Sequence, residues 1–293
     1  MKLPTAEGTL RRPSAFRRRY GPWALVTGAS SGIGRAMATA IASTGINVIA
    51  VARRGEELAE VAATLRQRHG VQTRVVAADL GTPQGTQAVH DATAQLDIGL
   101  LVAAAGFGTS GPFVDADPAT EQSMLDVNCR AVLDLTHTAA LRMTRRGGGG
   151  IVLLASLVGR QGTPQAAHYA ATKAYVQALG EALHVELRPR GVDVVTSTPG
   201  PVTSGFGDRA GMRLTTAAQP MQVAQATLNA LGRRMTVSPG PLSKTLAWSL
   251  APLPRPLRTR IMGRVMSGLV AAPEHRDPGP GSHPRLAQDS PAG

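Results

Sequence analysis

Tyr169 and Lys173 could transfer a proton together, because only four positions separate them in a segment rich in helix-forming residues. On a helix, side chains at i and i+4 lie on the same face, one turn apart. A lysine ammonium beside a phenol favours the phenolate and lowers the tyrosine pKa from its usual value of about 10. Tyr169 would then act as an acid or a base. Most tyrosine–lysine pairs at this spacing only decorate a helix surface, so the interpretation needs support from other residues.

Ser156 supplies part of that support. It follows the apolar run at residues 151–155, which predicts a buried strand with Ser156 at its carboxyl end. Open α/β sheets bind ligands at the carboxyl ends of their strands, so we expect the Ser156 hydroxyl to face a crevice. The helix that carries the pair is predicted to run from Pro164, which suits a first turn, to Arg188, which precedes a second proline.

A glycine-rich turn lies near the start of the chain. Residues 23–27 predict a strand, the sequence TGASSGIG follows with glycines at 28, 32 and 34, and residues 35–44 have helical periodicity. Glycines permit a tight turn and a close backbone approach, and the N-terminus of the next helix attracts a phosphate. A loop without a ligand is the alternative, but the flanking strand and helix favour a phosphate site.

The end of the second predicted strand, at residues 46–52, bears on the choice of nucleotide. NAD-binding folds place an acid on the ribose hydroxyl about 20 residues past the glycine turn, whereas an arginine accommodates the 2′-phosphate of NADP. Arg53 and Arg54 stand at this point, and residues 50–54 contain no carboxylate. The sequence therefore favours NADP, with NAD possible. The alternative is that both arginines simply open the helix predicted at residues 56–69.

The rest of the pattern alternates between strands and helices, which indicates an α/β fold. Further strands are predicted at residues 71–78, 98–103, 192–197 and 235–238. Further helices are predicted at residues 83–95, 118–146 and 221–234. Glycines 147–150 are expected to end the long helix before the strand that leads to Ser156. Residues 204–219 have no clear period and few charges, as a mobile substrate lid would, which favours a neutral or lipid-like substrate over a polyanion.

The composition is that of a globular protein from a reducing compartment. Of the 293 residues, 43% are apolar and 3% aromatic, which predicts a core of aliphatic side chains. The single cysteine, Cys129, excludes an intrachain disulfide and is expected to be a buried apolar residue. No apolar run is long enough for a spanning helix, and the N-terminal arginines lack the apolar segment of a secretory signal. We expect a cytoplasmic protein, and no metal site is predicted.

The formal net charge of +12 is concentrated at the two ends of the chain. Residues 1–20 contain six Lys or Arg and one Glu, and residues 232–293 contain nine Lys or Arg and three acids, which leaves a nearly neutral body. The neutral body argues against nucleic-acid binding by the fold. The basic ends permit peripheral contact with a membrane.

Four segments are expected along the chain. A basic extension at residues 1–21 precedes a catalytic domain at residues 22–240. An apolar and basic helical extension at residues 241–271 follows, and residues 272–293 have the composition of a disordered tail. Within the third segment, residues 258–270 predict an amphipathic helix, which could cover the substrate cleft, pair with another subunit or lie on a membrane surface.

Together, the motifs resemble those of the short-chain dehydrogenase/reductase family. Five features occur in the family's order over roughly residues 22–240: TGxxxGxG at residues 27–34, Asn128 on the long helix, Ser156, the pair Tyr169 and Lys173, and a Pro-Gly loop at Pro199. The resemblance implies a Rossmann-type, doubly wound, mostly parallel seven-stranded sheet with helices on both faces. It also implies reversible hydride transfer between NAD(P) and a small-molecule alcohol or carbonyl, by a homodimer or homotetramer that pairs through its long helices.

The resemblance further implies roles for single residues. Tyr169 would be the general acid for carbonyl reduction, and Lys173 would lower its pKa and hold the nicotinamide ribose. Ser156 would bond the substrate oxygen, and Asn128 would hold a water that relays protons. Besides Tyr169 and Lys173, the cofactor contacts would be Gly28, Ser30, Ser31, Gly32, Ile33, Gly34, Arg53, Asp79, Leu80, Ala105, Gly106, Pro199, Gly200, Val202 and Thr203.

The chain departs from the family at one point. Where the family usually has Asn-Asn-Ala-Gly after the fourth strand, residues 103–106 read Ala-Ala-Ala-Gly, so two amides that would bond nearby backbone are missing. A cofactor-binding regulatory or scaffold protein of the same fold is the alternative to an enzyme. Such a protein has no need of all four of Asn128, Ser156, Tyr169 and Lys173. The sequence therefore favours an NADPH-dependent carbonyl reductase or alcohol dehydrogenase.

Overall fold

The computed structural model describes residues 10, 13–203, 205, 207, 210–211, 217–240, 243, 245, 249–250 and 252–269. Within them, seven strands pair in parallel in the order β3-β2-β1-β4-β5-β6-β7. The strands are β1 (Trp23–Thr27), β2 (Asn47–Ala52), β3 (Thr73–Ala77), β4 (Ile98–Ala103), β5 (Gly149–Leu154), β6 (Val192–Ser197) and β7 (Thr236–Val237). This order confirms the predicted seven-stranded, doubly wound sheet, whose strand order reverses between β1 and β4.

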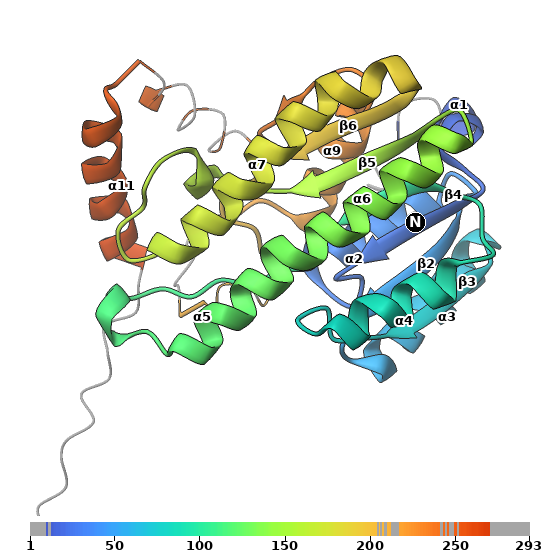
Figure 1. The fold of residues 1–293 in the computed structure, drawn as a ribbon, viewed down its shortest axis with the longest axis horizontal. Coiled ribbons are helices and arrows are strands. Elements are labelled where there is room, and N and C mark those ends of the chain that lie inside the picture. The colour runs from blue at the N-terminus through green and yellow to red at the C-terminus, as the bar shows by residue number, and fades with distance from the viewer. Residues whose placement is uncertain are drawn as a thin grey trace, which may run out of the picture.

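Helices cover both faces of the sheet (Figure 1). One apolar core joins the sheet to α1 (Pro13–Tyr20), α2 (Gly32–Ala42), α3 (Gly55–His69) and α9 (Pro220–Ala230). The other core joins it to α4 (Pro83–Thr93), α6 (Ala131–Arg145) and α7 (Ala167–Leu187). Alternate residues of one strand enter different cores, as Val26 and Leu25 do. The strands read as continuous apolar runs because they are buried on both faces.

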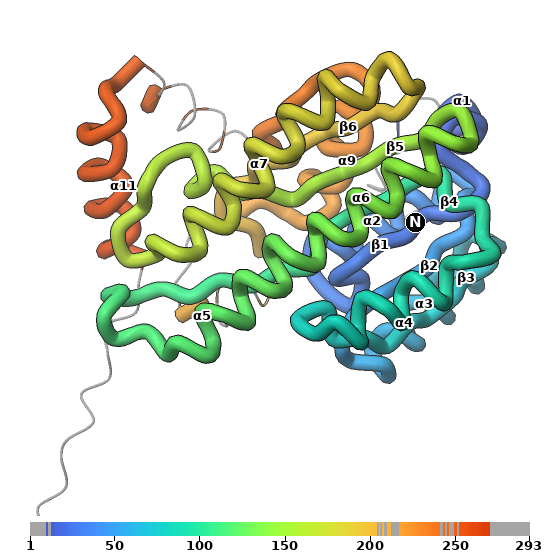
Figure 2. The backbone as a smooth tube through the Cα atoms, in the orientation of Figure 1, coloured from blue at the N-terminus to red at the C-terminus, as the bar shows by residue number. Residues whose placement is uncertain are grey.

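The long helix predicted at residues 118–146 contains a change of helical type. It begins as α5 (Pro118–Leu125), widens to a π-helical segment, η2 (Asp126–Arg130), and continues as α6. Figure 2 shows the three parts as one continuous path. Asp117 caps its start by accepting a hydrogen bond from the Thr120 backbone N–H at 2.9 Å. The π-helical segment contains Asn128, and such segments occur often at functional sites.

Several local details differ between the sequence-based expectations and the structure. Gly147 and Gly148 follow the end of the long helix as predicted, whereas Gly149 and Gly150 belong to β5, where helices approach the strand closely. A Cβ at Gly150 would lie 2.9 Å from the ring of Tyr20. Pro164 precedes the first residue of α7 instead of lying in its first turn. Residues 13–20, expected to be a basic extension, form α1, which buries Phe16 and Tyr20.

The C-terminal amphipathic helix predicted at residues 258–270 begins earlier, as α11 (Arg255–Leu269). It lies at the edge of the molecule, beside the segment that precedes α7 (Figure 1). A Cβ at Gly263 would lie 3.0 Å from the Pro164 ring, and one at Gly162 would lie 3.6 Å from Thr259, so the two segments are in direct contact. Most of the lid expected at residues 204–219, and all of the tail expected at residues 272–293, lie outside the described residues.

Candidate active site

A cavity of about 760 Å³ lies at the carboxyl ends of the strands. The turn after β1, the ends of β2 and β3, the loops after β4 and β5, and helices α7 and α11 contribute to its wall. Sixteen of the seventeen residues predicted to contact the cofactor line it; the exception is Thr203. Of the predicted catalytic residues, Ser156, Tyr169 and Lys173 line it, and Asn128 lies behind the wall. The topology therefore brings together residues as far apart in the chain as Gly28 and Leu269.

The glycine turn packs closely against neighbouring backbone because two of its glycines admit no side chain. Gly28 has φ +67°, and an added Cβ would lie 3.0 Å from the Ala104 carbonyl oxygen. At Gly34, an added Cβ would collide with the Gly28 carbonyl oxygen. The first helical turn of α2 consequently packs tightly against the loop. Ser31, at the N-cap, makes no side-chain capping bond, and residues 32–34 of the first turn of α2 line the cavity.

Thr27 fixes the loop after β4 at the point where residues 103 and 104 lack the amides usual in the family. Its buried hydroxyl accepts hydrogen bonds from the backbone N–H groups of Ala104 and Ala105, both at 3.0 Å. It also donates to the Val102 carbonyl oxygen at 3.4 Å. The loop after β4 is thus tied to the end of β1 without the Asn side chains that the family usually has.

Asn128 anchors the next residues of the same loop. Its Nδ2 donates to the Phe107 carbonyl oxygen at 2.9 Å and to Thr172 Oγ1 at 3.0 Å, and its Oδ1 accepts from the Phe107 N–H at 3.1 Å. The side chain is fully buried. A Cβ at Gly106 would lie 2.8 Å from Asn128 Oδ1 and 3.2 Å from Lys173 Nζ, so this glycine lets the loop approach both residues.

Tyr169 is a buried phenol that forms a hydrogen bond with the Ser156 hydroxyl. Ser156 reaches it from the loop directly after β5, as the strand-end prediction required. Burial raises the pKa of Tyr169 to about 12, and the bond to Ser156 partly opposes that rise. The expectation that Lys173 lowers this pKa is therefore not met in this structure. The neutral phenol, the form able to donate a proton, is favoured at neutral pH.

Lys173 is also buried, and its ammonium group points to the strand and not to the phenol. Its Nζ donates to the Leu154 carbonyl oxygen at 2.9 Å and lies 5.9 Å from the centre of the Tyr169 ring. Burial lowers the pKa of Lys173 to about 8, and the neighbouring Cys129 acts weakly in the other direction. The two side chains share a helix face as predicted, and desolvation dominates the titration of both.

Arg53 and Arg54 differ in their surroundings at the end of β2. Arg54 pairs with Glu57 at 2.6 Å, whereas no ion pair within the described residues involves Arg53. Arg53 is exposed and lines the cavity. Asp79 and Leu80 line the same end of the cavity from the end of β3. This end offers a free guanidinium for an anionic group.

The loop after β6 forms another part of the wall. Pro199, Gly200 and Val202 line the cavity, and the Gly200 N–H donates to Ser243 Oγ at 2.8 Å. Thr203 lies beside the wall, where its N–H donates to the Ala218 carbonyl oxygen at 2.9 Å. The loop is therefore fixed at both ends by segments that follow it in the chain.

Sequence reasoning missed several apolar residues of the wall. Phe107, Val158, Met262, Val265, Met266 and Leu269 line the cavity and were not predicted to do so. The amphipathic period of residues 258–270 was the signal for the last four. It left three roles open for this helix, and the structure places α11 over the cleft.

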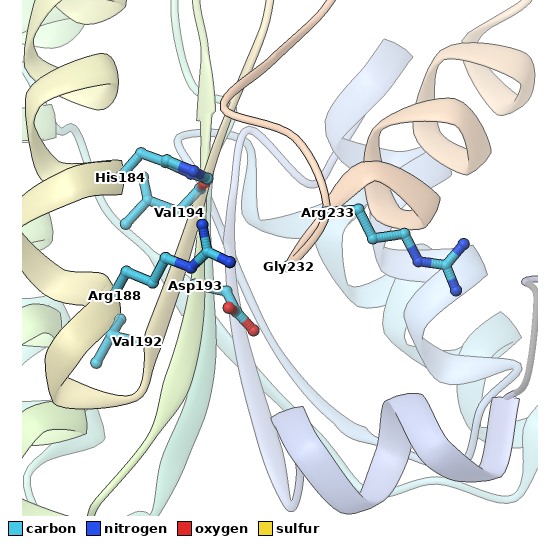
Figure 3. A pocket seen from close by; sticks show the side chains of 7 residues that line it. All are labelled: His184, Arg188, Val192, Asp193, Val194, Gly232 and Arg233. Atoms are coloured by element: carbon cyan, nitrogen blue, oxygen red, sulfur yellow. The ribbon is translucent and has the colours of Figure 1, made fainter.

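A second cavity, of about 30 Å³, lies at the opposite end of β6 and has room for little more than one water. Figure 3 shows Arg188 extending toward Asp193 while Arg233 points away from it. Asp193 Oδ2 accepts hydrogen bonds from Arg19 Nε at 2.6 Å and from the Tyr20 hydroxyl at 2.7 Å. Burial, together with the bond to Asp193, raises the pKa of Tyr20. These contacts hold α1 against the sheet, and they lie far from the first cavity.

Two features are absent from the described residues. These residues contain no cluster of three or more His, Cys, Asp and Glu side chains that could hold a metal ion. Among the helices of the described ranges, none is both long and apolar enough to cross a membrane.

Comparison with known proteins places this geometry in a family. The family model for short chain dehydrogenases matches residues 22–212. A 7beta-hydroxysteroid dehydrogenase of Collinsella aerofaciens is 30% identical over 236 residues, which cover 78% of this chain and 90% of that protein. A very-long-chain 3-oxoacyl-CoA reductase of Scheffersomyces stipitis is 32% identical over 249 residues, covering 80% and 71% of the two chains.

A solved structure agrees with the sequence relatives. The structure of a short-chain dehydrogenase from Sphingobium yanoikuyae in complex with NADPH superimposes on this one with a TM-score of 0.72. The two chains are 31% identical, and the match covers 83% of this chain and 95% of that one. Its likeness extends well beyond the glycine turn, to most of the described fold. The chain belongs to the short-chain dehydrogenase/reductase family of oxidoreductases, which act on CH–OH and C=O groups.

Proposed function

We propose that this protein is an NADPH-dependent carbonyl reductase that also catalyses the reverse oxidation of an alcohol, with Tyr169 as the group that gives and takes the proton. The observation that carries the proposal is the hydrogen bond between Ser156 and a buried Tyr169 at the wall of a cavity that begins at a glycine turn. A neutral phenol beside a second hydroxyl is suited to donate a proton to a carbonyl oxygen.

The residues present fit a dinucleotide. Glycines 28 and 34 let the turn pack against the neighbouring backbone, where a Cβ would collide, and the N-terminus of α2, which has no side-chain cap from Ser31, suits a diphosphate. Arg53 would take the 2′-phosphate, Asp79 and Leu80 would border the adenine, and Lys173 would hold the nicotinamide ribose. When bound, NADPH supplies the hydride. The relative in complex with NADPH supports this choice of nucleotide over NAD.

The protein's own groups would handle the substrate oxygen and the proton. Ser156 would donate a hydrogen bond to the carbonyl oxygen and orient it toward the Tyr169 hydroxyl. Tyr169 would transfer its proton to that oxygen as the hydride adds to carbon, which yields the alcohol. Lys173, charged at pH values below about 8, would stabilise the resulting phenolate. Asn128 would keep the loop at Phe107 in place and hold a water that returns a proton through Lys173.

The test of this proposal is Tyr169→Phe, which removes the transferable proton and keeps the ring. We expect reduction to fall by about 10² to 10⁴, the usual scale of general acid catalysis, while NADPH binding persists. Binding is measured by quenching of protein fluorescence, and turnover by NADPH absorbance across a panel of ketones. Turnover close to that of the wild type would show that another group supplies the proton. Equal inactivity of both proteins on the whole panel, with NADPH still bound, would favour the non-catalytic cofactor-binding alternative.

We also propose that the protein is a homodimer or homotetramer that pairs through α5–α6 and α7. Leu133 and Leu141 on α6, and Val185 on α7, expose between 46% and 61% of their surface, so burial of these side chains between two subunits would support the pairing. Light scattering at micromolar concentration measures the assembly, and a monomer would refute it. The cytoplasmic location stays a prediction.

A further inference from the structure

α11 forms the roof of the cavity on the side away from the glycine turn. Met262 and Met266 are almost fully buried, at 3% and 2% exposure, although the helix is amphipathic and lies at the edge of the molecule. Both side chains line the cavity, one helical turn apart on the same face. The apolar face of α11 is therefore turned toward the cavity and is covered by the body of the protein.

The roof also touches the surroundings of the reactive phenol. Met266 and Tyr169 belong to one buried apolar cluster with Met124 of α5 and Ala166, and Phe107 and Leu269 pack against it. A molecule whose carbonyl lay at Tyr169 would consequently extend along Met266. Helix α11 thus adjoins the substrate side of the reaction site, whereas the glycine turn adjoins its cofactor side.

Charge is distributed unevenly along the cavity. The charged residues of the described wall, apart from Lys173, come from the glycine turn and the ends of β2 and β3: Arg35, Arg53, Arg54, Glu57 and Asp79. At the α11 end, the described lining residues are apolar. The exposed Arg260 and Arg264 of α11 are not part of the lining. A charged group in this part of the cavity would lose its hydration without gaining a partner among the described lining residues.

We propose that the space between α11 and Tyr169 binds a large, uncharged, hydrocarbon-rich ketone or alcohol, and that Met262, Val265 and Met266 favour it by burying its apolar surface. This inference rests on the proposed function and specifies its substrate class. The thioether side chains are flexible, so they adapt to a rigid ring system or to a bulky aryl group more readily than branched side chains would. One relative named above is a hydroxysteroid dehydrogenase and the other is a 3-oxoacyl-CoA reductase. The apolar wall at α11 favours an uncharged ring system over an acyl-CoA, whose phosphates are anionic.

The experiment compares four carbonyl compounds: an uncharged steroid ketone, a diaryl ketone, cyclohexanone and a 3-oxoacyl-CoA. The wild type is expected to have a kcat/KM about 10- to 100-fold higher for the steroid ketone or the diaryl ketone than for cyclohexanone, because burial of the extra rings on α11 adds affinity. A higher kcat/KM for the 3-oxoacyl-CoA than for either bulky neutral ketone would overturn the proposal.

Val265→Asp and Ser267→Asp form a matched pair on the same helix. Val265 lines the cavity at 37% exposure, so the aspartate can be tolerated by the fold, whereas Ser267 is exposed and outside the lining. Val265→Asp should raise KM for the bulky ketone by about 10- to 100-fold. Ser267→Asp should leave it within about threefold. Both should bind NADPH like the wild type, and equal effects of the two substitutions on KM would overturn the proposal.

A binding measurement separates this proposal from the proposed reaction. The uncharged steroid ketone should raise the Tm of the wild type and of Tyr169→Phe alike, and it should not raise that of Val265→Asp. If Tyr169→Phe keeps full turnover while this pattern of Tm shifts holds, the assignment of Tyr169 as the acid is wrong, but the proposed binding of the ketone between α11 and Tyr169 stands. If none of the three proteins gains stability from the ketone, that binding proposal is refuted, whatever the activity.

Discussion

Asn128 bonds both backbone groups of Phe107, since its amide nitrogen donates to the carbonyl oxygen and its amide oxygen accepts from the N–H. A third bond, to Thr172 Oγ1, ties the same side chain to α7. Asn128 therefore links three segments, namely the π-helical part of the long helix, the loop after β4 and the helix that carries Tyr169 and Lys173. Its position depends on the local widening of the helix at η2.

Asn128→Ala should lower the free energy of unfolding by about 1 to 3 kcal/mol, because it leaves the backbone of Phe107 and the Thr172 hydroxyl without their partner. Urea denaturation followed by circular dichroism measures this change. Asn128→Ser is the comparison, since a shorter polar side chain can restore only part of the contact. An unchanged midpoint for Asn128→Ala would show that the three hydrogen bonds contribute little to stability.

Thr27→Val should weaken cofactor binding and stability together. The substitution keeps the shape of the side chain and removes the oxygen that accepts from Ala104 and Ala105. Two buried N–H groups would lose their partner, at a cost of about 1 to 3 kcal/mol. Thr27→Ser keeps the oxygen and should behave nearly like the wild type. The measurements are Tm and the Kd for NADPH, and a loss with Thr27→Ser equal to that with Thr27→Val would argue against the hydroxyl.

Arg53→Ala should reduce the affinity for NADPH about 10-fold or more and leave that for NADH nearly unchanged, because only NADPH has a 2′-phosphate to pair with the guanidinium. Arg54→Ala is the matched control, since its guanidinium already pairs with Glu57. Fluorescence titration with both nucleotides measures the effect. If Arg54→Ala discriminates between the nucleotides and Arg53→Ala does not, the two arginines have been assigned the wrong way round.

The stability of the protein should depend on pH through Lys173. Burial lowers the pKa of this amine to about 8 from its ordinary 10.5, so between these values the unfolded chain binds more protons than the folded one. The free energy of unfolding then rises with pH in that window. Relative to Lys173→Met, the wild type should gain about 2 kcal/mol between pH 7.5 and 9.5.

Urea denaturation of both proteins across this window provides the measurement. Tyr169 contributes in the opposite direction and at higher pH, because its pKa is raised from 10.0 to about 12 and stability falls as pH rises between those values. The chosen window ends before that range. A constant difference between the two proteins from pH 7.5 to 9.5 would mean that Lys173 titrates normally.

The sheet could be predicted because its strands are apolar runs bounded by glycines or charges, and β1, β4 and β6 begin and end at the predicted residues. Helix α1 could not, because it contains three consecutive arginines and its buried Tyr20 packs near Gly150 and Gly232, which come much later in the chain. The direction of the pKa shift of Tyr169 could not be predicted either, for the same reason. Burial raises this pKa, and the side chains that pack with the phenol include Met124 and Met266, which come from elements far apart in the chain.

The candidate site divides in a similar way. The glycine turn, Ser156, Tyr169 and Lys173 could be identified from spacing alone, since each lies at a strand end or on one helix face. The bonds of Thr27 to the loop after β4 join residues more than 70 positions apart, and nothing in the local pattern at residues 103–106 indicates them. The role of α11 was left open for the same reason, because amphipathicity shows that a face is apolar without showing what covers it.

The close fit of Tyr20 bears on where the folding unit begins. Its ring lies 2.9 Å from the place that a Cβ on Gly150 would occupy, its hydroxyl lies at the same distance from that place on Gly232, and its hydroxyl also bonds Asp193. Three strands or turns have thus been shaped around one side chain that precedes the family match, which starts at residue 22. A polypeptide that began at the first matched residue would have a cavity in place of the Tyr20 ring, and Asp193 would lack the hydrogen bonds from Arg19 and Tyr20. The folded unit of this protein therefore begins before the first residue of the family match.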